Sequence, residues 1–186
     1  MKEKFQIWRF FTPIFLHVGF SHLVFNVISQ IIFGSLLEMM IGFRQMAQLY
    51  IASGFGGILF SAMVSNSNSV GASTADFGIY TGFLAMIFVN WNAFSASPQL
   101  EQMRCMFLFF VVLIIVINLL TSSGRNSTVD VYGHIGGAIT GLLWGFAFFP
   151  RVKSESGEKL KKFGMIATPV YFGLFLILFF TAKKLY

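Results

Sequence analysis

Six apolar runs, each close to the length of a membrane-spanning helix, constrain this chain more than any other feature. They cover about residues 22–40, 46–64, 73–89, 106–120, 133–149 and 164–181. An α-helix needs about 20 mostly apolar residues to cross a bilayer, and it satisfies its backbone hydrogen bonds internally where no water is present. We therefore predict an all-α fold, a polytopic helical membrane bundle with six transmembrane helices.

The composition supports a membrane protein over a soluble domain. Of 186 residues, 56% are hydrophobic and only 11% are charged, whereas soluble domains carry about 25% charged residues. Basic residues near the cytoplasmic ends of membrane helices explain the net charge of +6, so we expect the lipid bilayer and no nucleic acid as a partner. The single cysteine cannot form a disulfide within the chain, and no Cys/His set has zinc spacing, so no metal or cofactor is expected.

The chain divides into three predicted parts. Residues 1–21 form an interfacial loop segment, because aromatic and basic residues mix there and Pro13 breaks any long helix. Residues 22–149 form the core helices. Residues 150–186 form a basic cytoplasmic loop, with five Lys/Arg between 151 and 162, and a further transmembrane helix. Because Lys and Arg gather on the cytoplasmic side of membrane proteins, this loop sets the predicted orientation.

Four polar residues stand out because they lie within apolar spans. Ser73 begins the third span and His134 lies at the start of the fifth; His22 and Asn26 are four residues apart in the first, and therefore share a helical face. In the predicted orientation all four lie near the outer or luminal end of their helices. Polar groups at membrane depth are costly, so such residues are candidates for function.

These residue types can together perform nucleophilic catalysis. A serine hydroxyl needs a neighbouring base and hydrogen-bond donors for the oxyanion that develops. Ser73 would attack and His134 would accept its proton, while His22, Asn26 and the Ser73 backbone N–H would donate to the oxyanion. Glycines at helical spacing in both spans would allow the two helices to approach closely; they are Gly78, Gly82, Gly137, Gly141 and Gly145.

Structural explanations of the same residues remain open. Ser73 and Asp76 have the spacing of a capping box, in which serine caps a helix N-terminus. His134 can instead be a structural or relay residue. Asp130, four residues before His134, is either a third catalytic member or the boundary between loop and helix.

At this point the residues match a family. The chain resembles the rhomboid intramembrane serine proteases over essentially its whole length. The matching elements are Trp8-Arg9 followed by F-F-T, His22-x-x-x-Asn26, Glu38, Gly71-x-Ser73, and His134 followed by Gly136, Gly137 and Gly141.

The resemblance implies an intramembrane serine endopeptidase that cleaves transmembrane segments of single-pass membrane proteins by a Ser-His dyad. Ser73 would be the nucleophile, His134 the general base, and His22, Asn26 and the Ser73 amide the oxyanion site. Phe77 would pack on the histidine, with Gly71, Trp8 and Arg9 in supporting positions. No cofactor is implied, and the location would be the secretory pathway or the plasma membrane.

Two departures from the family pattern accompany the match. Thr74 replaces the second glycine of the usual G-x-S-G motif, at a place where added volume is costly. The chain is also expected to lack the family's first transmembrane helix, while the last span would be the extra helix of a 6+1 arrangement. The alternative function is a catalytically inactive rhomboid-like protein that binds transmembrane helices for trafficking or degradation. A channel or transporter would need more intramembrane carboxylates.

Overall fold

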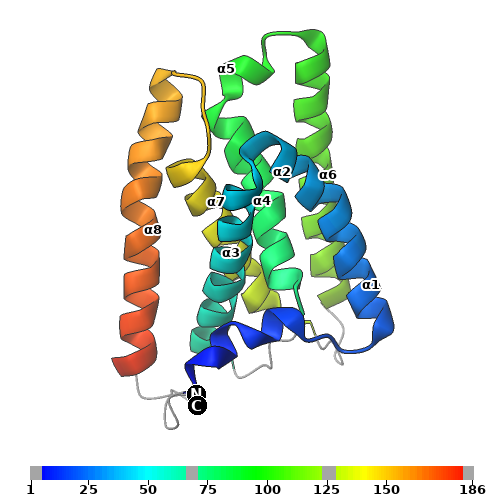
Figure 1. The fold of residues 1–186 in the computed structure, drawn as a ribbon, viewed down its shortest axis with the longest axis vertical. Coiled ribbons are helices and arrows are strands. Elements are labelled where there is room, and N and C mark those ends of the chain that lie inside the picture. Colours follow the sequence, from blue (N-terminus) through cyan, green and yellow to red (C-terminus); the bar gives the residue numbers. More distant parts are fainter. Residues whose placement is uncertain (1–5, 66–70, 123–128, 182–186) are drawn as a thin grey trace.

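A computed structural model describes residues 6–65, 71–122 and 129–181, and within these ranges it is an all-helical bundle (Figure 1). The predicted fold class is confirmed. Among the described residues, five segments are long and apolar enough to cross a membrane. They are Phe20–Ile41, α3 (Phe43–Val64), Pro98–Ile117 of α6 (Pro98–Ser122), α7 (Val131–Phe148) and α8 (Glu155–Thr181). The sixth, α4 (Ser73–Val89), is apolar but shorter, with 17 residues.

The N-terminal segment forms two short 3₁₀-helices, η2 (Ile7–Phe10) and η3 (Thr12–Phe15), which lie across one end of the bundle (Figure 1). The predicted break at Pro13 is confirmed, because Pro13 lies in the first turn of η3, where a missing N–H costs nothing. Phe10 is buried and meets the rings of Phe55 in α3 and Phe179 in α8 edge-on, at 5.5 and 5.1 Å. These contacts hold the segment against the bundle.

The first span is one helical segment with a π-turn in its middle. It consists of α1 (Phe20–Ser29), the π-helix η4 (Gln30–Gly34) and α2 (Ser35–Ile41). Gly42, with a φ of 82°, then turns the chain into α3. Side-chain hydrogen bonds at the π-turn join the segment to its neighbours: Ser29 bonds the Tyr80 hydroxyl, and Gln30 donates to the Tyr50 hydroxyl at 3.3 Å.

Helices α3, α4 and α7 form the tightly packed centre. Most residues of α4 are buried on every side, so its apolar residues need not lie on a single face. Small residues bring the backbones together: a Cβ added to Gly137 or Gly141 would run into the carbonyl oxygen of Thr74 or Gly78. The predicted glycine faces therefore do bring the serine and histidine helices into contact.

Two predicted boundaries are wrong. The predicted start of the fourth span, at residue 106, is too late, because α6 already begins at Pro98 and a short helix α5 (Trp91–Phe94) precedes it. The predicted basic loop 151–162 becomes helical at Glu155. There the Ser154 hydroxyl accepts the Gly157 N–H at 3.1 Å, and Lys159 pairs with Glu155 one turn away. Such capping and (i, i+4) pairing start a helix in a charged segment.

The outer surface of the bundle is apolar, as expected for helices that face lipid. Phe25, Phe109 and Ile177, from three different spans, have 73%, 62% and 63% of their surface exposed. Exposed side chains of this size on several helices are costly in water and favourable in a bilayer. The protein is therefore a multi-pass membrane protein.

Candidate active site

Ser73 and His134 lie in hydrogen-bond contact. The Ser73 Oγ and the His134 Nε2 are 2.7 Å apart, although 61 residues separate them in the chain. Ser73 is partly exposed and His134 is buried. Both residues lie in the first turns of their helices, at the end of the bundle where η2 and η3 cross it (Figure 1). This arrangement has the spacing that a serine nucleophile and its general base require.

Ser73 does not act as a helix cap. Ala72 occupies the N-cap position of α4, Ser73 is the first helical residue, and no side chain caps this end. The capping-box interpretation of Ser73 and Asp76 is therefore wrong. The Ser73 hydroxyl contacts His134, and the Ser73 backbone N–H lies at the N-terminus of α4. The hydroxyl and the N–H of Ser73 therefore lie at the same end of the bundle.

His134 is held by its own helix start and by an aromatic ring. Asp130 is the N-cap of α7: its Oδ1 accepts the Gly133 N–H at 3.0 Å and the Ser61 hydroxyl at 2.8 Å. Of the two roles left open for Asp130, this geometry corresponds to the loop-to-helix boundary. Phe77 stacks on the His134 ring with centroids 4.4 Å apart and planes 9° from parallel.

His22 and Asn26 lie next to Gly71, two residues before Ser73. A Cβ added to Gly71 would lie 2.6 Å from His22 Cε1 and 3.5 Å from Asn26 Nδ2. The Gly71 φ of 119° and its N–H bond to the Pro13 carbonyl, at 2.9 Å, place the backbone there. Asn26 is buried, and its Nδ2 has no hydrogen-bond partner among the described residues. A buried amide donor without a partner is available to an incoming oxygen.

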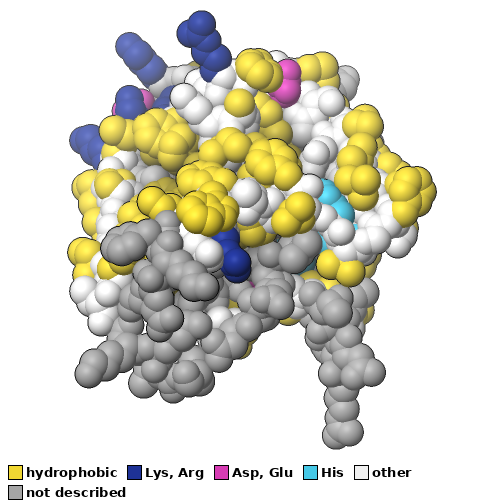
Figure 2. Space-filling model, turned by 60° about the horizontal axis from the view of Figure 1, so that its bottom comes forward, with side chains coloured by type: hydrophobic (Ala, Val, Ile, Leu, Met, Phe, Trp, Pro, Cys, Tyr) yellow, Lys and Arg dark blue, Asp and Glu magenta, His cyan; other side chains and the backbone are white. Residues whose placement is uncertain are grey.

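His17, which the sequence suggested only as a polar bond in the interfacial segment, lies near the site. Its ring lies edge-on to that of His22, with centroids 5.3 Å apart. Its Nε2 accepts the N–H of Ala72, directly before the serine, at 3.4 Å. No local pattern indicates this contact, because it joins the N-terminal segment to the start of α4 across 55 residues. Figure 2, which brings this end of the molecule forward, shows histidine side chains at the surface.

The tight place around Thr74 accommodates its side chain. Thr74 is 3% exposed. Glycines of the neighbouring helices surround it: a Cβ on Gly57 would lie 3.0 Å from the Thr74 Cβ, and one on Gly133 2.9 Å from its Cγ2. In the usual G-x-S-G motif a glycine stands at the position of Thr74. The larger threonine side chain fits here because the residues opposite it, on α3 and α7, are glycines.

The other supporting residues lie at the edge of this region. Trp8 and Arg9 are exposed on η2, and within the described ranges no contact joins them to Ser73 or His134.

Asp76, one turn along α4, is buried, and neither carboxylate oxygen has a hydrogen-bond partner among the described residues. The described residues contain no group of three His, Cys, Asp or Glu able to hold a metal ion.

Comparisons with known proteins agree with the motif resemblance. A family model described as the rhomboid domain matches residues 4–151. The chain is 36% identical over 181 residues to RHOMBOID-like protein 6, mitochondrial, of Arabidopsis thaliana, covering 96% of this chain and 56% of that protein. It is 35% identical over 141 residues to Rhomboid-like protease 3 of Toxoplasma gondii, covering 75% of this chain and 51% of that protein.

The chain spans about half the length of these two curated relatives. The matched region nevertheless includes both segments that form the Ser73–His134 contact, and it extends over most of the helical bundle. A serine and a histidine in contact within a membrane bundle, and a family model that covers most of the chain, lead to one conclusion. The chain belongs to the rhomboid family, a family of intramembrane proteases.

Proposed function

We propose that this protein is an intramembrane serine endopeptidase that cleaves transmembrane segments of single-pass membrane proteins. The observation that carries the proposal is the 2.7 Å contact between Ser73 Oγ and His134 Nε2. Membership of the rhomboid family supports the reaction class, since one relative is named as a rhomboid-like protease. The substrate class rests on family resemblance.

The proposed reaction follows the chemistry of acyl transfer. The Ser73 oxygen attacks the scissile carbonyl carbon while His134 Nε2 takes the hydroxyl proton. His134 then gives this proton to the leaving amine as the C–N bond breaks, which leaves an acyl-enzyme. A water molecule, deprotonated by His134, attacks the ester carbonyl, and the proton returns to Ser73 as the acid product departs.

The donors for the developing oxyanion are the Ser73 backbone N–H, the Asn26 amide and the His22 ring. Two observations support Asn26: its Nδ2 is buried and has no hydrogen-bond partner among the described residues, and it lies beside Gly71 near the nucleophile. Donors fixed in place before the reaction need no reorganisation when charge appears. His22 also lies beside Gly71, and its ring contacts His17, which supports a defined orientation.

The alternative, a catalytically inactive helix-binding protein, rested on Thr74 and on the expected lack of the family's first transmembrane helix. The glycines opposite Thr74 weaken the argument from Thr74, because they leave room for its side chain, although its Oγ1 is buried without a hydrogen-bond partner among the described residues. The contact between Ser73 and His134 also favours the protease, since an inactive protein has no need of that contact.

For the location, we propose the secretory pathway or the plasma membrane, on the basis of the resemblance to 6+1 rhomboids that end in an extra helix such as α8. One relative that covers 96% of the chain is named as mitochondrial. A fluorescent fusion expressed from the native locus distinguishes the two: staining of mitochondria would overturn this part of the proposal.

The decisive experiment measures serine reactivity in detergent-solubilised protein with a fluorophosphonate probe. We expect the unmodified protein to be labelled, and labelling to vanish in both Ser73→Ala and His134→Ala. Ser35→Ala is the matched control, because Ser35 is exposed on α2 and should label like the unmodified protein.

Cleavage of a single-span reporter in proteoliposomes, followed by the same variants, connects serine reactivity to proteolysis. Equal labelling of Ser73→Ala and the unmodified protein would contradict the assigned nucleophile. A folded protein that is neither labelled nor cleaves any reporter, while it retains bound transmembrane peptides, would favour the inactive alternative.

A further inference from the structure

Asp76 carries a buried carboxyl group that the proposed reaction does not use. It lies one turn into α4, and 2% of its surface is exposed. Neither of its oxygens has a hydrogen-bond partner among the described residues. It also belongs to neither of the two ion pairs that these residues form. A carboxyl group left in this state inside a membrane bundle is a candidate for function.

The carboxyl group lies where the first span meets α3 and α4. The Gln30 amide, in the π-turn, is beside it, although without the geometry of a hydrogen bond. Gln30 itself donates to the Tyr50 hydroxyl of α3 at 3.3 Å. Tyr80, one turn after Asp76 on α4, bonds Ser29. The two side-chain bonds that attach the π-turn therefore flank the carboxyl group.

Among the described residues, the elements packed around α4 offer no positive charge to Asp76. On α7, His134 is hydrogen-bonded to Ser73, and positions 135–150 contain no titratable residue. On α6, Arg104 pairs with the glutamate three residues before it, and α8 contacts the far end of α4. Two histidines of the N-terminal region face each other beside the turn that precedes α4: His17 and His22.

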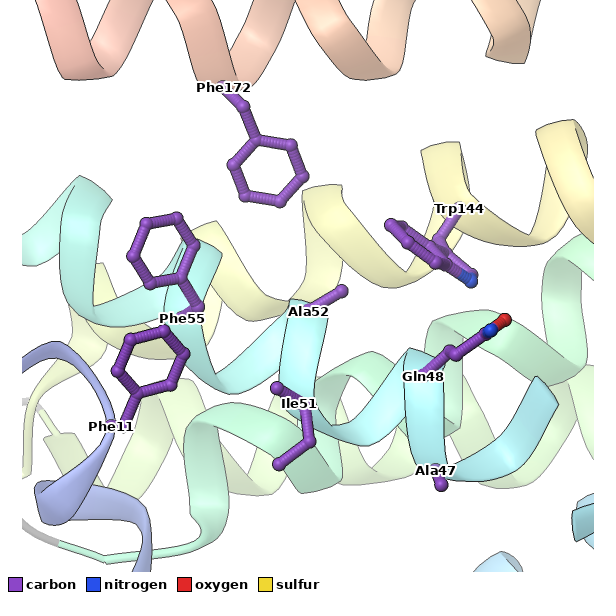
Figure 3. A pocket seen from close by; sticks show the side chains of 8 residues that line it. All are labelled: Phe11, Ala47, Gln48, Ile51, Ala52, Phe55, Trp144 and Phe172. Carbon is purple, nitrogen blue, oxygen red and sulfur yellow. The ribbon is translucent and has the colours of Figure 1, made fainter. Parts of the chain in front are cut away.

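The surroundings of Asp76 are uncharged and closed to water. The groups that face it come from the first span, α3 and α4: Ser29, Gln30, Tyr50 and Tyr80. An open groove runs between α3, α7 and α8 (Figure 3), but its lining includes neither Asp76 nor any of these four residues. A carboxylate charge without water, cation or hydrogen bond is so costly at membrane depth that the group keeps its proton.

We propose that Asp76 is a positioning residue whose proton holds the first span against α4. As a neutral acid, it is compatible with the dry contact. Once ionised, the carboxylate needs water, and the first span is the element that can move to admit it, because 22% of that span is buried against 44% of α3 and most of α4. The closed arrangement holds the proton and the open one releases it, so a rise in pH favours the open arrangement.

The movement reaches the proposed active site through the first span itself. Asn26 and Gln30 are four residues apart, so they lie one turn from each other on the same face. Asn26 is the proposed oxyanion donor beside Gly71. Opening at Gln30 would withdraw this amide from Ser73. This consequence, unlike the movement, rests on the proposed function.

Hydrogen exchange of detergent-solubilised protein, followed by mass spectrometry, tests the movement without reference to activity. Two proteins are compared, both carrying Ser73→Ala: one retains Asp76 and the other carries Asp76→Asn, whose amide has the shape of the neutral acid and cannot ionise. The measured quantity is the ratio of their exchange rates in 20–34 at the same pH, so the pH dependence of exchange chemistry cancels. Between about pH 5 and about pH 9, where buried carboxyl groups titrate, the ratio should rise from near one to about ten, since one released proton changes an opening equilibrium tenfold per pH unit.

Exchange in α7 should be equal in both proteins at every pH. Glu155→Gln, which removes an exposed carboxyl group of α8, is the matched control and should behave like its parent. A ratio that stays at one over the whole pH range would overturn the proposal. A change in exchange that follows the Na⁺ concentration at constant pH would overturn it as well, because a bound cation would then neutralise Asp76. If Asp76→Asn does not fold, exchange of 20–34 relative to α7 within the parent protein provides the same test.

Cleavage of the single-span reporter connects the movement to the reaction. Over the same pH range, cleavage by the unmodified protein should fall about tenfold relative to Asp76→Asn. His134 titrates in both proteins, so its effect cancels in this comparison. Equal pH profiles of cleavage, together with a rising exchange ratio, would overturn the positioning role. No cleavage by either protein, with the exchange ratio still rising, would contradict the proposed function and support the proton-dependent movement.

Discussion

The Ser73–His134 pair and the Asn26 donor lie in two regions of the bundle that are packed very differently. Half of the α7 span is buried inside the bundle, and most residues of α4 are buried, whereas only 22% of the span from Phe20 to Ile41 is buried. The distance between serine and histidine is thus set by close backbone contacts. The amide donor belongs to a span that is tied to its neighbours by a few side-chain hydrogen bonds at the π-turn.

The proposed site therefore depends on two kinds of contact: backbone packing between α4 and α7, and side-chain hydrogen bonds that hold the first span. Backbone contacts at glycine have no side-chain freedom, so a small added volume at α4 and α7 must displace a helix. The first span can change its position at lower cost, because it buries less surface and its π-turn is a place where helices often bend. We therefore expect perturbations of the centre to lower the stability of the fold, and perturbations of the first span to affect mainly the reaction.

The largest expected effect is that of Gly137→Ala. Its Cβ would run into the Thr74 carbonyl oxygen, which belongs to the backbone and cannot rotate away. Overpacking of about 3 kcal/mol would lower the melting temperature by roughly 6–12 °C in a chain of this size. Probe labelling of Ser73 should be lost with it. Thermal unfolding of detergent-solubilised protein measures the shift.

Gly173→Ala is the matched control for this substitution. A Cβ at Gly173 meets nothing within 4 Å, so only the higher helix propensity of alanine acts, and stability should stay equal or rise. If both alanine variants melted at the same temperature as the unmodified protein, the proposed rigidity of the α4–α7 contact would be wrong.

The next effect is on rate rather than on stability. Asn26→Ala should slow reporter cleavage by about 10²–10³-fold, the usual cost of one oxyanion donor. The melting temperature should remain within about 2 °C, because the amide nitrogen has no hydrogen-bond partner among the described residues that would be lost. Asn92→Ala, on the exposed face of α5, should cleave normally. Unchanged cleavage by Asn26→Ala would remove this residue from the proposed oxyanion site.

A smaller effect is expected where α7 begins. Asp130→Ala removes the acceptor for the Gly133 N–H and the Ser61 hydroxyl, at a cost of about 1–2 kcal/mol. Asp130→Asn keeps an oxygen in this position and should restore most of the stability and labelling. If the asparagine variant instead melted like the unmodified protein but lost its activity entirely, the carboxylate charge would have a catalytic role, and capping would not be the explanation.

The smallest effect concerns the attachment of the first span. Tyr80→Phe removes the hydroxyl that bonds Ser29 and should cost about 1 kcal/mol. Hydrogen exchange followed by mass spectrometry should show faster exchange in 20–34 and unchanged exchange in α4 and α7. Ser29→Ala should give the same pattern, and the double variant should add little. Faster exchange throughout the bundle would contradict a separate, loosely held first span.

Much of the fold follows from the sequence because its cause is local. Apolar runs near 20 residues long predict membrane helices wherever they occur, and all six predicted spans are helical. Pro13 predicts a break because its ring and missing N–H act at that residue. The residues Ser73, His134, His22 and Asn26 were recognisable because polar groups within apolar spans are few, and because their spacing matches a family.

The tertiary structure decided what depends on contacts between distant segments. It placed Ser73 Oγ against His134 in place of a helix cap, assigned Asp130 to capping, and brought His17 to the start of α4. It also explained how Thr74 fits, because the glycines that make room for it lie on two other helices. The composition of a segment determines that it is a membrane helix, but which of its faces meets a neighbour, and at what distance, is fixed only when the backbones pack.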